Sequence, residues 1–332
     1  MNRLDFVAIG DIVTDAFIEL EDAWIENDNP EGSKELCMRF GDKIPYRKVD
    51  VVRAVGNGPN AAVAAKRLGL ASATLTDVGD DDVGAGIIGQ LRDEGVSEEF
   101  VRIHAGMASN YHYVLRFGAE RTILVKHQTY DYVLPEELTA RAPRWMYLTS
   151  LGENSLDYHD AIATWLEQNP DTKLAFQPGT FQMRLGAERL ARLYAESDLF
   201  FCNKEEAQRI LNSKSKDIKK LSKDLMVLGP KIVVITDGPA GATVYDGEKF
   251  WHTTMYPDPK EPVDRTGAGD SFASTFTCAL ALGKTIPEAL SWGPINSMSV
   301  VQEIGAQRGL LSREKLEEYL ANAPEDYGAR EI

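Results

Sequence analysis

The segment Pro262-Val-Asp-Arg-Thr-Gly-Ala-Gly-Asp-Ser-Phe-Ala-Ser274 carries the most structural information in this chain. It joins a glycine-rich turn, Thr266–Asp270, to an apolar stretch of small residues, Phe272–Leu282, which predicts a buried helix. Glycines at the start of a helix let the backbone approach a ligand closely and leave free N–H groups pointing at it. Because these groups and the helix dipole favour negative charge, the turn predicts a phosphate-binding site.

Asp270 comes directly after the two glycines of this turn. It would lie beside a bound anion, where its carboxylate could take a proton from an attacking hydroxyl. A second interpretation is that Asp270 only stabilises the first helical turn, as acidic residues commonly do. The rest of the sequence is needed to distinguish these two roles.

The bulk composition of the 332 residues is that of a globular protein, with 43% hydrophobic and 26% charged residues. The formal net charge of −15 argues against nucleic acids and anionic membranes as partners, because those surfaces attract basic proteins. Cys37, Cys202 and Cys278 show no metal-binding spacing, and reduced cysteines fit a cytoplasmic protein. Residues 1–10 lack the long apolar region of a signal peptide, so we expect a soluble protein that is not exported.

Predicted strands and helices alternate along most of the chain. After a strand at 6–10 come helix 60–70, strand 73–76, helix 83–94, strand 145–148, helix 158–168, strand 173–176, helix 186–195, strand 199–202, a helix from Lys204 and strand 231–236. This alternation predicts an α/β fold with a parallel sheet covered on both faces. Ligands bind such sheets at the carboxyl ends of the strands, where Asp11, Asp15, Asn203 and Thr236 are found.

Residues 16–56 depart from this alternation. They are polar and contain short alternating pieces, Glu35–Phe40 and Val49–Val52, that are typical of strands. We expect a small β-rich excursion, which residues 111–117 and 122–126 join later in the chain. Since the excursion cannot build a core of its own, we expect it to close over a substrate or to pair with a second copy, as a homodimer.

The segment Gly56-Asn-Gly-Pro-Asn-Ala61 allows more than one interpretation. Its spacing, with Asp77 and Asp80 about 20 residues further on, formally matches the dinucleotide-binding fingerprint. Pro59 and Asn60 argue against it, because a pyrophosphate needs bare backbone at the start of the helix. We therefore interpret Asn57 and Asn60 as hydrogen-bonding groups for a polyhydroxy substrate, with helix capping by Asn60 as the structural alternative.

The segment Asn203-Lys-Glu-Glu206 begins a helix at the end of a predicted strand. Asparagine caps helices and acidic residues suit first turns, so one interpretation is purely structural. The other is that Asn203 and Glu206, three residues apart on one helix face, hold a hydrated magnesium ion, which needs few protein ligands. The five histidines (104, 112, 127, 159 and 252) show no metal spacing and are expected at surface or turn positions.

Taken in order, these segments resemble the ribokinase-like (PfkB) carbohydrate kinase family over almost the whole chain. The resemblance rests on Gly56–Gly69, Val78–Gly84, Leu91–Val96, Asn203–Glu206, Val263–Asp270 and Gly305–Gln307. The most specific of these is Val263–Asp270, because it resembles the family's second signature, whose last aspartate is the catalytic base. The resemblance implies a three-layer ribokinase-like α/β core (residues 1–15, 57–110 and 127–332) and a β-sheet lid (residues 16–56 with 111–126).

The resemblance also implies the cofactors and the roles of individual residues. ATP would be the phosphoryl donor with Mg²⁺, while dependence on a monovalent cation is left open. Gly267, Ala268 and Gly269 would form an anion hole, and Asp270 would deprotonate the acceptor. The remaining expected ligand-binding residues are Asp15, Asn57, Gly58 and Asn60 for the acceptor, Thr236 and Gly238 for the triphosphate, Asn203 and Glu206 for magnesium and phosphate, and Asn296 for the adenine.

Three departures from the family pattern bear on the acceptor. Val55 stands where the first signature usually has glycine, Val13 where ribokinase has asparagine, and Arg265 where a small residue or proline is usual. These changes leave the catalytic residues intact but put ribose in doubt as the acceptor.

Charge indicates the chemical class of the acceptor. Asp11 and Asp15 beside the two asparagines suit neutral hydroxyls, since carboxylates accept hydrogen bonds from them but repel phosphate. We therefore expect an unphosphorylated sugar, with a nucleoside as the alternative. Lid aromatic residues that could hold a nucleoside base are Trp24, Phe40, Tyr113 and Phe117. The intact Asp270 argues against a non-catalytic sensor protein.

Overall fold

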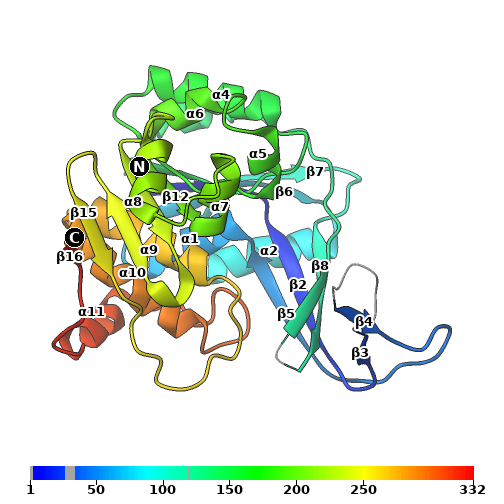
Figure 1. Ribbon diagram of the computed structural model, residues 1–332. Coiled ribbons are helices and arrows are strands. Elements are labelled where there is room, and N and C mark those ends of the chain that lie inside the picture. Colours follow the sequence, from blue (N-terminus) through cyan, green and yellow to red (C-terminus); the bar gives the residue numbers. More distant parts are fainter. Residues whose placement is uncertain (1–2, 27–33, 119) are drawn as a thin grey trace.

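The computed structural model describes residues 3–26, 34–118 and 120–332 (Figure 1). Its larger sheet has the strand order β16-β15-β14-β13-β12-β11-β10-β1-β6-β7, in which the strands from β13 to β7 run parallel and β14 to β16 antiparallel. These strands are β1 (Phe6–Ile9), β6 (Ser72–Gly79), β7 (Ser97–His104), β10 (Trp145–Leu148), β11 (Lys173–Phe176), β12 (Ser197–Asn203), β13 (Ile232–Thr236), β14 (Ala242–Tyr245), β15 (Phe250–Thr253) and β16 (Arg330–Glu331).

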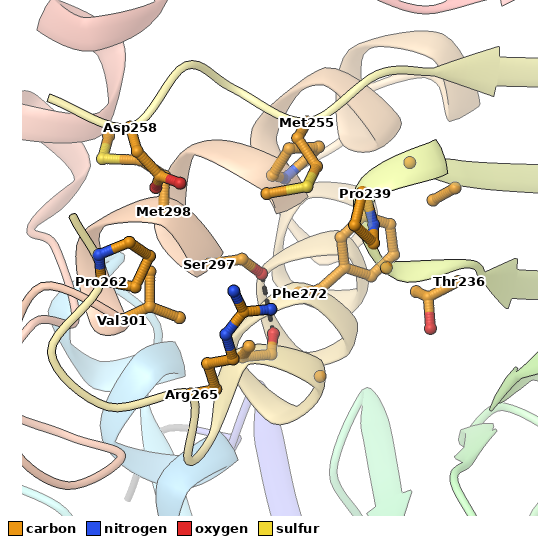
Figure 2. Close-up of a pocket in the computed structure, with 16 residues that line it drawn as sticks. Thr236, Pro239, Met255, Asp258, Pro262, Arg265, Phe272, Ser297, Met298 and Val301 are labelled. Atoms are coloured by element: carbon orange, nitrogen blue, oxygen red, sulfur yellow. Dashed lines mark hydrogen bonds between the residues drawn. The ribbon is translucent and has the colours of Figure 1, made fainter. Parts of the chain in front are cut away.

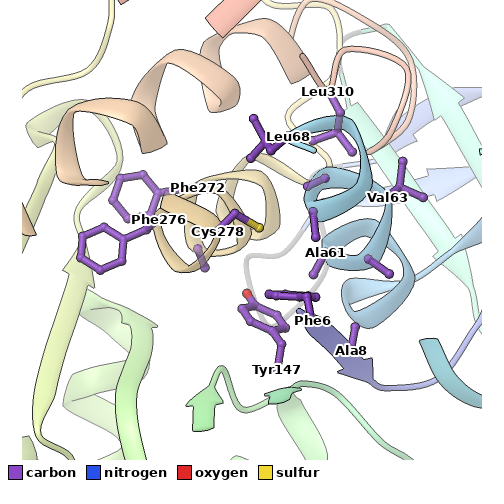
Figure 3. Packing of buried hydrophobic residues seen from close by; sticks show 14 of the residues in the cluster. Phe6, Ala8, Ala61, Val63, Leu68, Tyr147, Phe272, Phe276, Cys278 and Leu310 are labelled. Carbon is purple, nitrogen blue, oxygen red and sulfur yellow. The ribbon is translucent and has the colours of Figure 1, made fainter. Parts of the chain in front are cut away.

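Helices cover both faces of this sheet and make it the middle of three layers (Figure 1). In β1, Phe6 and Ala8 enter one hydrophobic core while Val7 and Ile9 enter the other, as the two-residue period of a strand requires. The first core packs against α1 (Asn57–Arg67), α2 (Asp82–Asp93), α9 (Ala268–Ala281), α10 (Ile286–Val300) and α11 (Arg313–Ala321); part of it is shown in Figure 3. The second packs against α3 (Glu137–Ala140), α4 (Leu156–Gln168), α5 (Thr180–Leu185), α6 (Ala191–Glu196), α7 (Lys204–Ile210) and α8 (Ile218–Met226).

A separate small sheet has the order β5-β2-β8-β9. Its strands are β2 (Val13–Leu20), β5 (Tyr46–Val55), β8 (Tyr111–Phe117) and β9 (Glu120–Leu124), and a hairpin of β3 (Trp24–Glu26) and β4 (Glu35–Cys37) lies beside it (Figure 1). This sheet confirms the expected β excursion. Residues 27–33 of the expected lid lie outside the described part of the chain.

The register of the small sheet gives it two different faces. Asp15 lies opposite both Val52 and His112, and the three share a face with Phe17 and Val114. This first face packs against Ile304 of the core domain. The second face carries Val49, Val51, Tyr113 and Leu124, all exposed, and we call it the outer lid face.

Two predicted helices have different bounds in the structure. The predicted helix 186–195 is wrong in its first half. Helix α5 ends at Leu185, because Gly186 takes a φ of 85° that stops the helix. The next helix, α6, begins only at Ala191. Helix α1 begins at Asn57 and not at residue 60, because Pro59 fits a first helical turn, where its missing N–H costs nothing. None of the described helices is long and apolar enough to cross a membrane.

Candidate active site

The glycine-rich turn forms the start of α9, as predicted. Gly267 caps the helix with a φ of 80°, and a Cβ added there would fall 2.4 Å from the Cβ of Ala306. The position therefore requires glycine for both its backbone conformation and its close packing. The first N–H groups of a helix have no intrahelical partner, so those of Ala268, Gly269 and Asp270 are available to an anion.

The carboxylate of Asp270 is held by two amide side chains. Its Oδ2 accepts a hydrogen bond from Asn60 Nδ2 at 3.2 Å, and its Oδ1 accepts one from Gln177 Nε2 at 3.4 Å. Burial raises the pKa of Asp270, and the charge of Glu206 adds to this, while the two amide donors act in the opposite direction. A carboxylate with a raised pKa is a better proton acceptor than an exposed one, which suits a general base.

Asn60 is itself oriented by a second amide. Its side chain is 5% exposed, and its Oδ1 accepts a hydrogen bond from Gln307 Nε2 at 3.0 Å. Gln307 also donates to the carbonyl oxygen of Ala54 at 2.7 Å. In the described structure, therefore, Asn60 positions Asp270, and it caps no helix because it lies inside α1.

Gly58 and Asn57 of the same motif have different surroundings. Gly58 is buried, and a Cβ there would lie 3.1 to 3.2 Å from backbone atoms of Ile9 and Gly10. This close packing on β1 accounts for the glycine without a ligand contact. Asn57 is half-buried at the first position of α1, so its side chain stays available for the expected acceptor.

A pocket of about 420 Å³ lies beside the start of α9 (Figure 2). Ala268 and Gly269 line its inner end, and Thr236 and Gly238 line it from the end of β13, where the sequence placed triphosphate contacts. Its remaining wall is mostly apolar and includes Met255, Phe272, Pro294, Met298 and Val301. An apolar slot that leads to exposed helix N–H groups is the shape expected for a nucleotide site.

Asn296 does not reach this pocket, contrary to the sequence prediction. It is fully buried, its Nδ2 donates to Thr275 Oγ1 at 2.7 Å, and its Oδ1 accepts from the backbone N–H of Leu311 at 2.9 Å. The helical periodicity of α10 turns it away from the cavity, which Pro294 and Ser297 line instead. Asn296 therefore joins α9 and α10 to the C-terminal region.

Asn203 and Glu206 form a reciprocal helix cap at the start of α7. Asn203 Oδ1 accepts from the N–H of Glu206, and Glu206 Oε2 accepts from the N–H of Asn203, both at 2.8 Å. The structural interpretation of this motif is thus correct, and Asn203 has its side-chain oxygen occupied. Burial raises the pKa of Glu206. Its Oε1 has no hydrogen bond within the described structure and is the oxygen that could face a hydrated magnesium ion.

On the other side of Asp270, polar side chains gather between the core and the small sheet. Asp11 Oδ1 accepts from the hydroxyl of Tyr132 at 2.8 Å, and its Oδ2 lies 3.8 Å from His127 Nδ1. Burial raises the pKa of Asp11 to about 7. Asp15 Oδ1 lies 3.4 Å from His112 Nδ1, and the His112 and His127 rings are 5.2 Å apart, edge to face.

This cluster contains buried polar atoms without partners. Asp15 Oδ1 and His112 Nε2 have no hydrogen bond within the described part of the chain. Since buried polar groups normally find a partner, these two atoms are available to a ligand. The structure thus connects Asp11 and Asp15 through the two contacting histidine rings.

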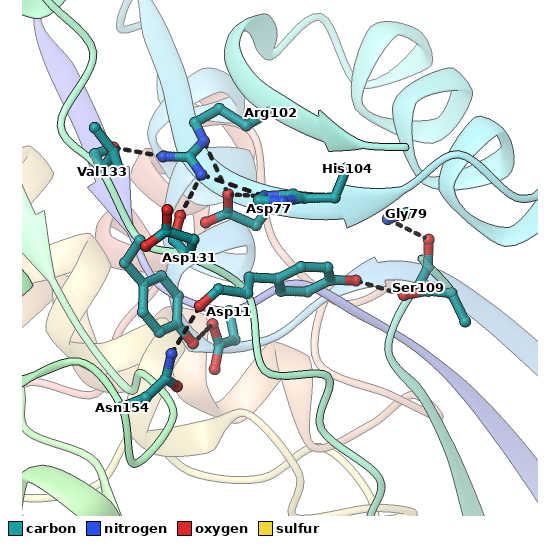
Figure 4. A network of polar contacts seen from close by, with 12 residues as sticks. Asp11, Asp77, Gly79, Arg102, His104, Ser109, Asp131, Val133 and Asn154 are labelled. Atoms are coloured by element: carbon teal, nitrogen blue, oxygen red, sulfur yellow. Dashed lines mark hydrogen bonds and ion pairs between the residues drawn. The ribbon is translucent and has the colours of Figure 1, made fainter. Parts of the chain in front are cut away.

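The expectation that the histidines lie at surface or turn positions is confirmed for His127, which is exposed in a loop, and is wrong for His159, because periodicity and spacing do not show which residues become buried. His112 and His127 belong to the cluster just described, and His159 is 2% exposed and bonded to Gln182. His104 Nε2 lies 2.6 Å from Asp77 Oδ1 in a polar network that also contains Arg102 (Figure 4).

That network fixes the loop that carries Tyr132. Arg102 contacts Asp77 and donates to the carbonyl oxygens of Asp131 and Val133. These bonds position the backbone on both sides of Tyr132, whose hydroxyl reaches Asp11. Asp77 therefore has a structural role, because its buried carboxylate is engaged by Arg102 and His104.

Gln177 is a further site residue that the sequence reasoning missed. It directly follows β11 and thus obeys the same carboxyl-end rule that pointed to Asp11 and Thr236. The rule was applied only to carboxylates and capping residues, although it holds for any polar side chain.

A three-layer α/β core, a small accessory sheet and an anion-binding helix start with an adjacent carboxylate define the ribokinase-like class of kinases. The family model for pfkB family carbohydrate kinases matches residues 35–313, and the chain belongs to this family. It is therefore a carbohydrate kinase, a phosphotransferase with an alcohol group as acceptor.

Similar proteins agree with this assignment. Ribokinase from Bacillus subtilis is 28% identical over 274 residues, which cover 80% of this chain and 87% of that protein. The structure of Arabidopsis thaliana ribokinase complexed with ribose and ATP has a TM-score of 0.81 at 19% identity and covers 96% of this chain and 99% of its own. Methanocaldococcus jannaschii nucleoside kinase has a TM-score of 0.76 at 16% identity, with 97% and 100% covered. At such identities the two structures show the shared fold.

Proposed function

We propose that this protein uses ATP to phosphorylate a hydroxyl group of a small unphosphorylated sugar. The observation that carries this proposal is the place of Asp270. Its carboxylate is held by Asn60 and Gln177 at the start of α9, beside the nucleotide-shaped pocket. A base in this position can meet both an acceptor hydroxyl and the terminal phosphoryl group of a nucleotide in the pocket.

In the proposed reaction each part of the site has its own task. The apolar wall of the pocket takes the adenine, and Thr236 and Gly238 lie along the path of the phosphates. Backbone N–H groups of Ala268 and Gly269 stabilise the negative charge on the transferring phosphoryl group. Asp270 accepts the proton from the acceptor hydroxyl as the oxygen attacks in line, and the bond from phosphorus to the ADP oxygen breaks.

Magnesium fits one carboxylate of this site. Glu206 holds its Oε1 free of hydrogen bonds in the described structure and lies close enough to Asp270 to affect its pKa. Mg²⁺ keeps most of its waters and needs few protein oxygens, so this single carboxylate is compatible with a water-mediated site. When bound, the ion would neutralise charge on the ATP phosphates.

The acceptor is proposed to bind between Asp11 and the small sheet. Asp15 Oδ1 accepts from a sugar hydroxyl, while His112 Nε2 accepts or donates according to its tautomer. The carboxylates of Asp11 and Asp15 would repel a phosphorylated sugar. The small sheet acts as a lid that keeps water from the phosphoryl group.

A nucleoside remains the second candidate because aromatic rings border this cluster. His127 lies edge-on to both His112 and Phe181, with ring centroids 5.2 and 6.2 Å apart. Such rings can hold a flat base. The lid residues proposed for this role from the sequence are less suitable: Trp24, Phe40 and Tyr113 are exposed, and Tyr113 lies on the outer lid face, away from Asp15.

A screen of ATP consumption tests the proposed function. Ribose, fructose, other free sugars, their phosphates and nucleosides are each offered with ATP and Mg²⁺, with and without K⁺, and ADP release is measured. We expect turnover with a free sugar. Turnover of fructose 6-phosphate with none of free sugars or nucleosides would contradict the proposal.

We also propose that the outer lid face pairs with a second copy of the chain. Val49 and Val51 of β5, Tyr113 of β8 and Leu124 of β9 are 37 to 51% exposed on this face. Contiguous exposed apolar residues on a sheet commonly mark an interaction site. A homodimer would bury this face and leave the opposite face, with Asp15, directed at the acceptor.

A further inference from the structure

The side chain of Arg265 lines the nucleotide pocket and is unpaired among the described residues. It belongs to the segment that leads into α9, two residues before the helix cap Gly267. It is exposed to the pocket, and it makes no hydrogen bond or ion pair with any described residue. In Figure 2 its guanidinium group overlaps the hydrogen bond that Ser297 donates to the carbonyl oxygen of Ala268.

The neighbouring acid does not neutralise this arginine. Asp264 is buried, and its Oδ1 accepts from both the N–H and the hydroxyl of Thr266, at 2.9 and 2.7 Å. Its Oδ2 accepts from the N–H of Gly305 at 3.1 Å, and Arg121 lies 3.6 Å from Oδ1. The carboxylate of Asp264 is thus engaged away from the pocket, and the charge of Arg265 stays available.

Among the described residues, the lining of the pocket contains no second basic side chain. Arg265 is the only Lys or Arg among the described residues that line it. The acidic residue that lines the pocket, Asp258, accepts a hydrogen bond from Gln302 Nε2 at 3.4 Å. In a chain with a net charge of −15, an unpaired guanidinium beside exposed helix N–H groups provides a site for an anion. Arginine suits phosphate because its planar group can donate two parallel hydrogen bonds.

We propose that Arg265 binds the two inner phosphates of the nucleotide, those that remain in ADP after transfer. This inference rests on the proposed function, which places a nucleotide in this pocket. The terminal phosphoryl group belongs at the start of α9 near Asp270, which does not line the pocket, and the base belongs in the apolar slot. Arg265 lines this pocket two residues before the cap of α9, and in this proposal it sets the affinity for the nucleotide.

Calorimetric titration with ATP, ADP and adenosine tests this role. The Arg265→Ala variant should bind ATP and ADP about 10- to 100-fold more weakly, as expected on losing charge-assisted hydrogen bonds. Its affinity for adenosine should not change, because adenosine has no phosphate. The Arg265→Lys variant should lose part of the affinity, since lysine keeps the charge but not the paired donors.

Arg189 provides a matched control, because it is exposed and lies outside the pocket. The Arg189→Ala variant removes the same charge and should bind all three ligands normally. Both variants should melt at the wild-type temperature without ligand. An equal loss for adenosine would mean that Arg265 stacks on the base, and an unchanged affinity for ADP would also overturn the assignment. If the wild-type protein bound neither ATP nor ADP, the proposed function itself would fail.

Discussion

Replacing Asp270 by asparagine separates its two possible roles. The substitution keeps the size of the side chain but removes the ability to accept a proton. General-base removal typically lowers turnover by on the order of 10²- to 10⁴-fold, which corresponds to about 3 to 5 kcal/mol of activation free energy. We therefore expect kcat to fall by that factor.

The contacts of Asp270 predict a much smaller effect on folding. Asn60 and Gln177 both donate to the carboxylate, so the new amide can accept from one of them and must face the other with its own NH₂ group. This loss is offset because a buried charge, whose raised pKa reflects its poor solvation, is removed. We expect the free energy of unfolding to change by about 1 kcal/mol. ATP affinity should persist, since the helix N–H groups are unaffected.

Three measurements on the Asp270→Asn variant decide whether Asp270 is a general base or only stabilises its helix. They are kcat from an ADP-release assay, nucleotide affinity by calorimetry, and the melting temperature. Asp82→Asn is the matched control, because Asp82 is an exposed acid in the first turn of α2. It should lose at most about 1 kcal/mol of stability and no activity. Near-normal kcat in the Asp270→Asn variant, with a lowered melting temperature, would show that Asp270 only stabilises its helix.

Three further substitutions test other parts of the structure. Asp11 has a pKa of about 7 in the folded protein against an ordinary value of 3.8, so its contribution to stability is complete below about pH 4 and is lost as the pH rises through 7. The Asp11→Asn variant should therefore gain melting temperature relative to wild type over this range, and a constant difference would contradict the raised pKa. The Gly267→Ala variant must accommodate a Cβ 2.4 Å from the Cβ of Ala306 at a φ of 80°. It should therefore lose about 1 to 3 kcal/mol of unfolding free energy in a denaturant titration. The control variant Gly269→Ala, which has open space around its Cβ, should lose none. The Val51→Lys variant should be a monomer by light scattering at micromolar concentration, because it places a charge on the outer lid face. The wild type and a Val227→Lys control, altered at another exposed apolar site, should be dimers. A monomeric wild type would refute pairing through the outer lid face.

The alternating core and the position of the helix that begins after Gly267 could be predicted from the sequence because both depend on local patterns. Strand-forming runs such as Phe6–Ile9 and the glycine turn at Gly267 show their structure within a few residues. The break at Gly186 was missed, since a glycine inside an amphipathic stretch is compatible with helix until its φ is known.

The partners of site residues could not be predicted in this way. Whether Asn60 faces a ligand or Asp270 depends on how α1 and α9 pack, and which face of α10 carries Asn296 depends on the rotation of that helix. The contact between the His112 and His127 rings likewise joins residues from separate segments of the chain. These are long-range contacts, which local patterns in the sequence do not reveal.

The bonds around Asp270 also bear on the order in which the protein becomes active during synthesis. Asn60 lies 210 residues before Asp270 along the chain, and Gln307, which orients Asn60, lies 247 residues after it. A ribosome that has made the entire nucleotide pocket up to Val301 has not yet added Gln307. The carboxylate of Asp270 therefore gains its complete hydrogen-bonded support only after Gln307 has been added, close to the C-terminal end of the sequence.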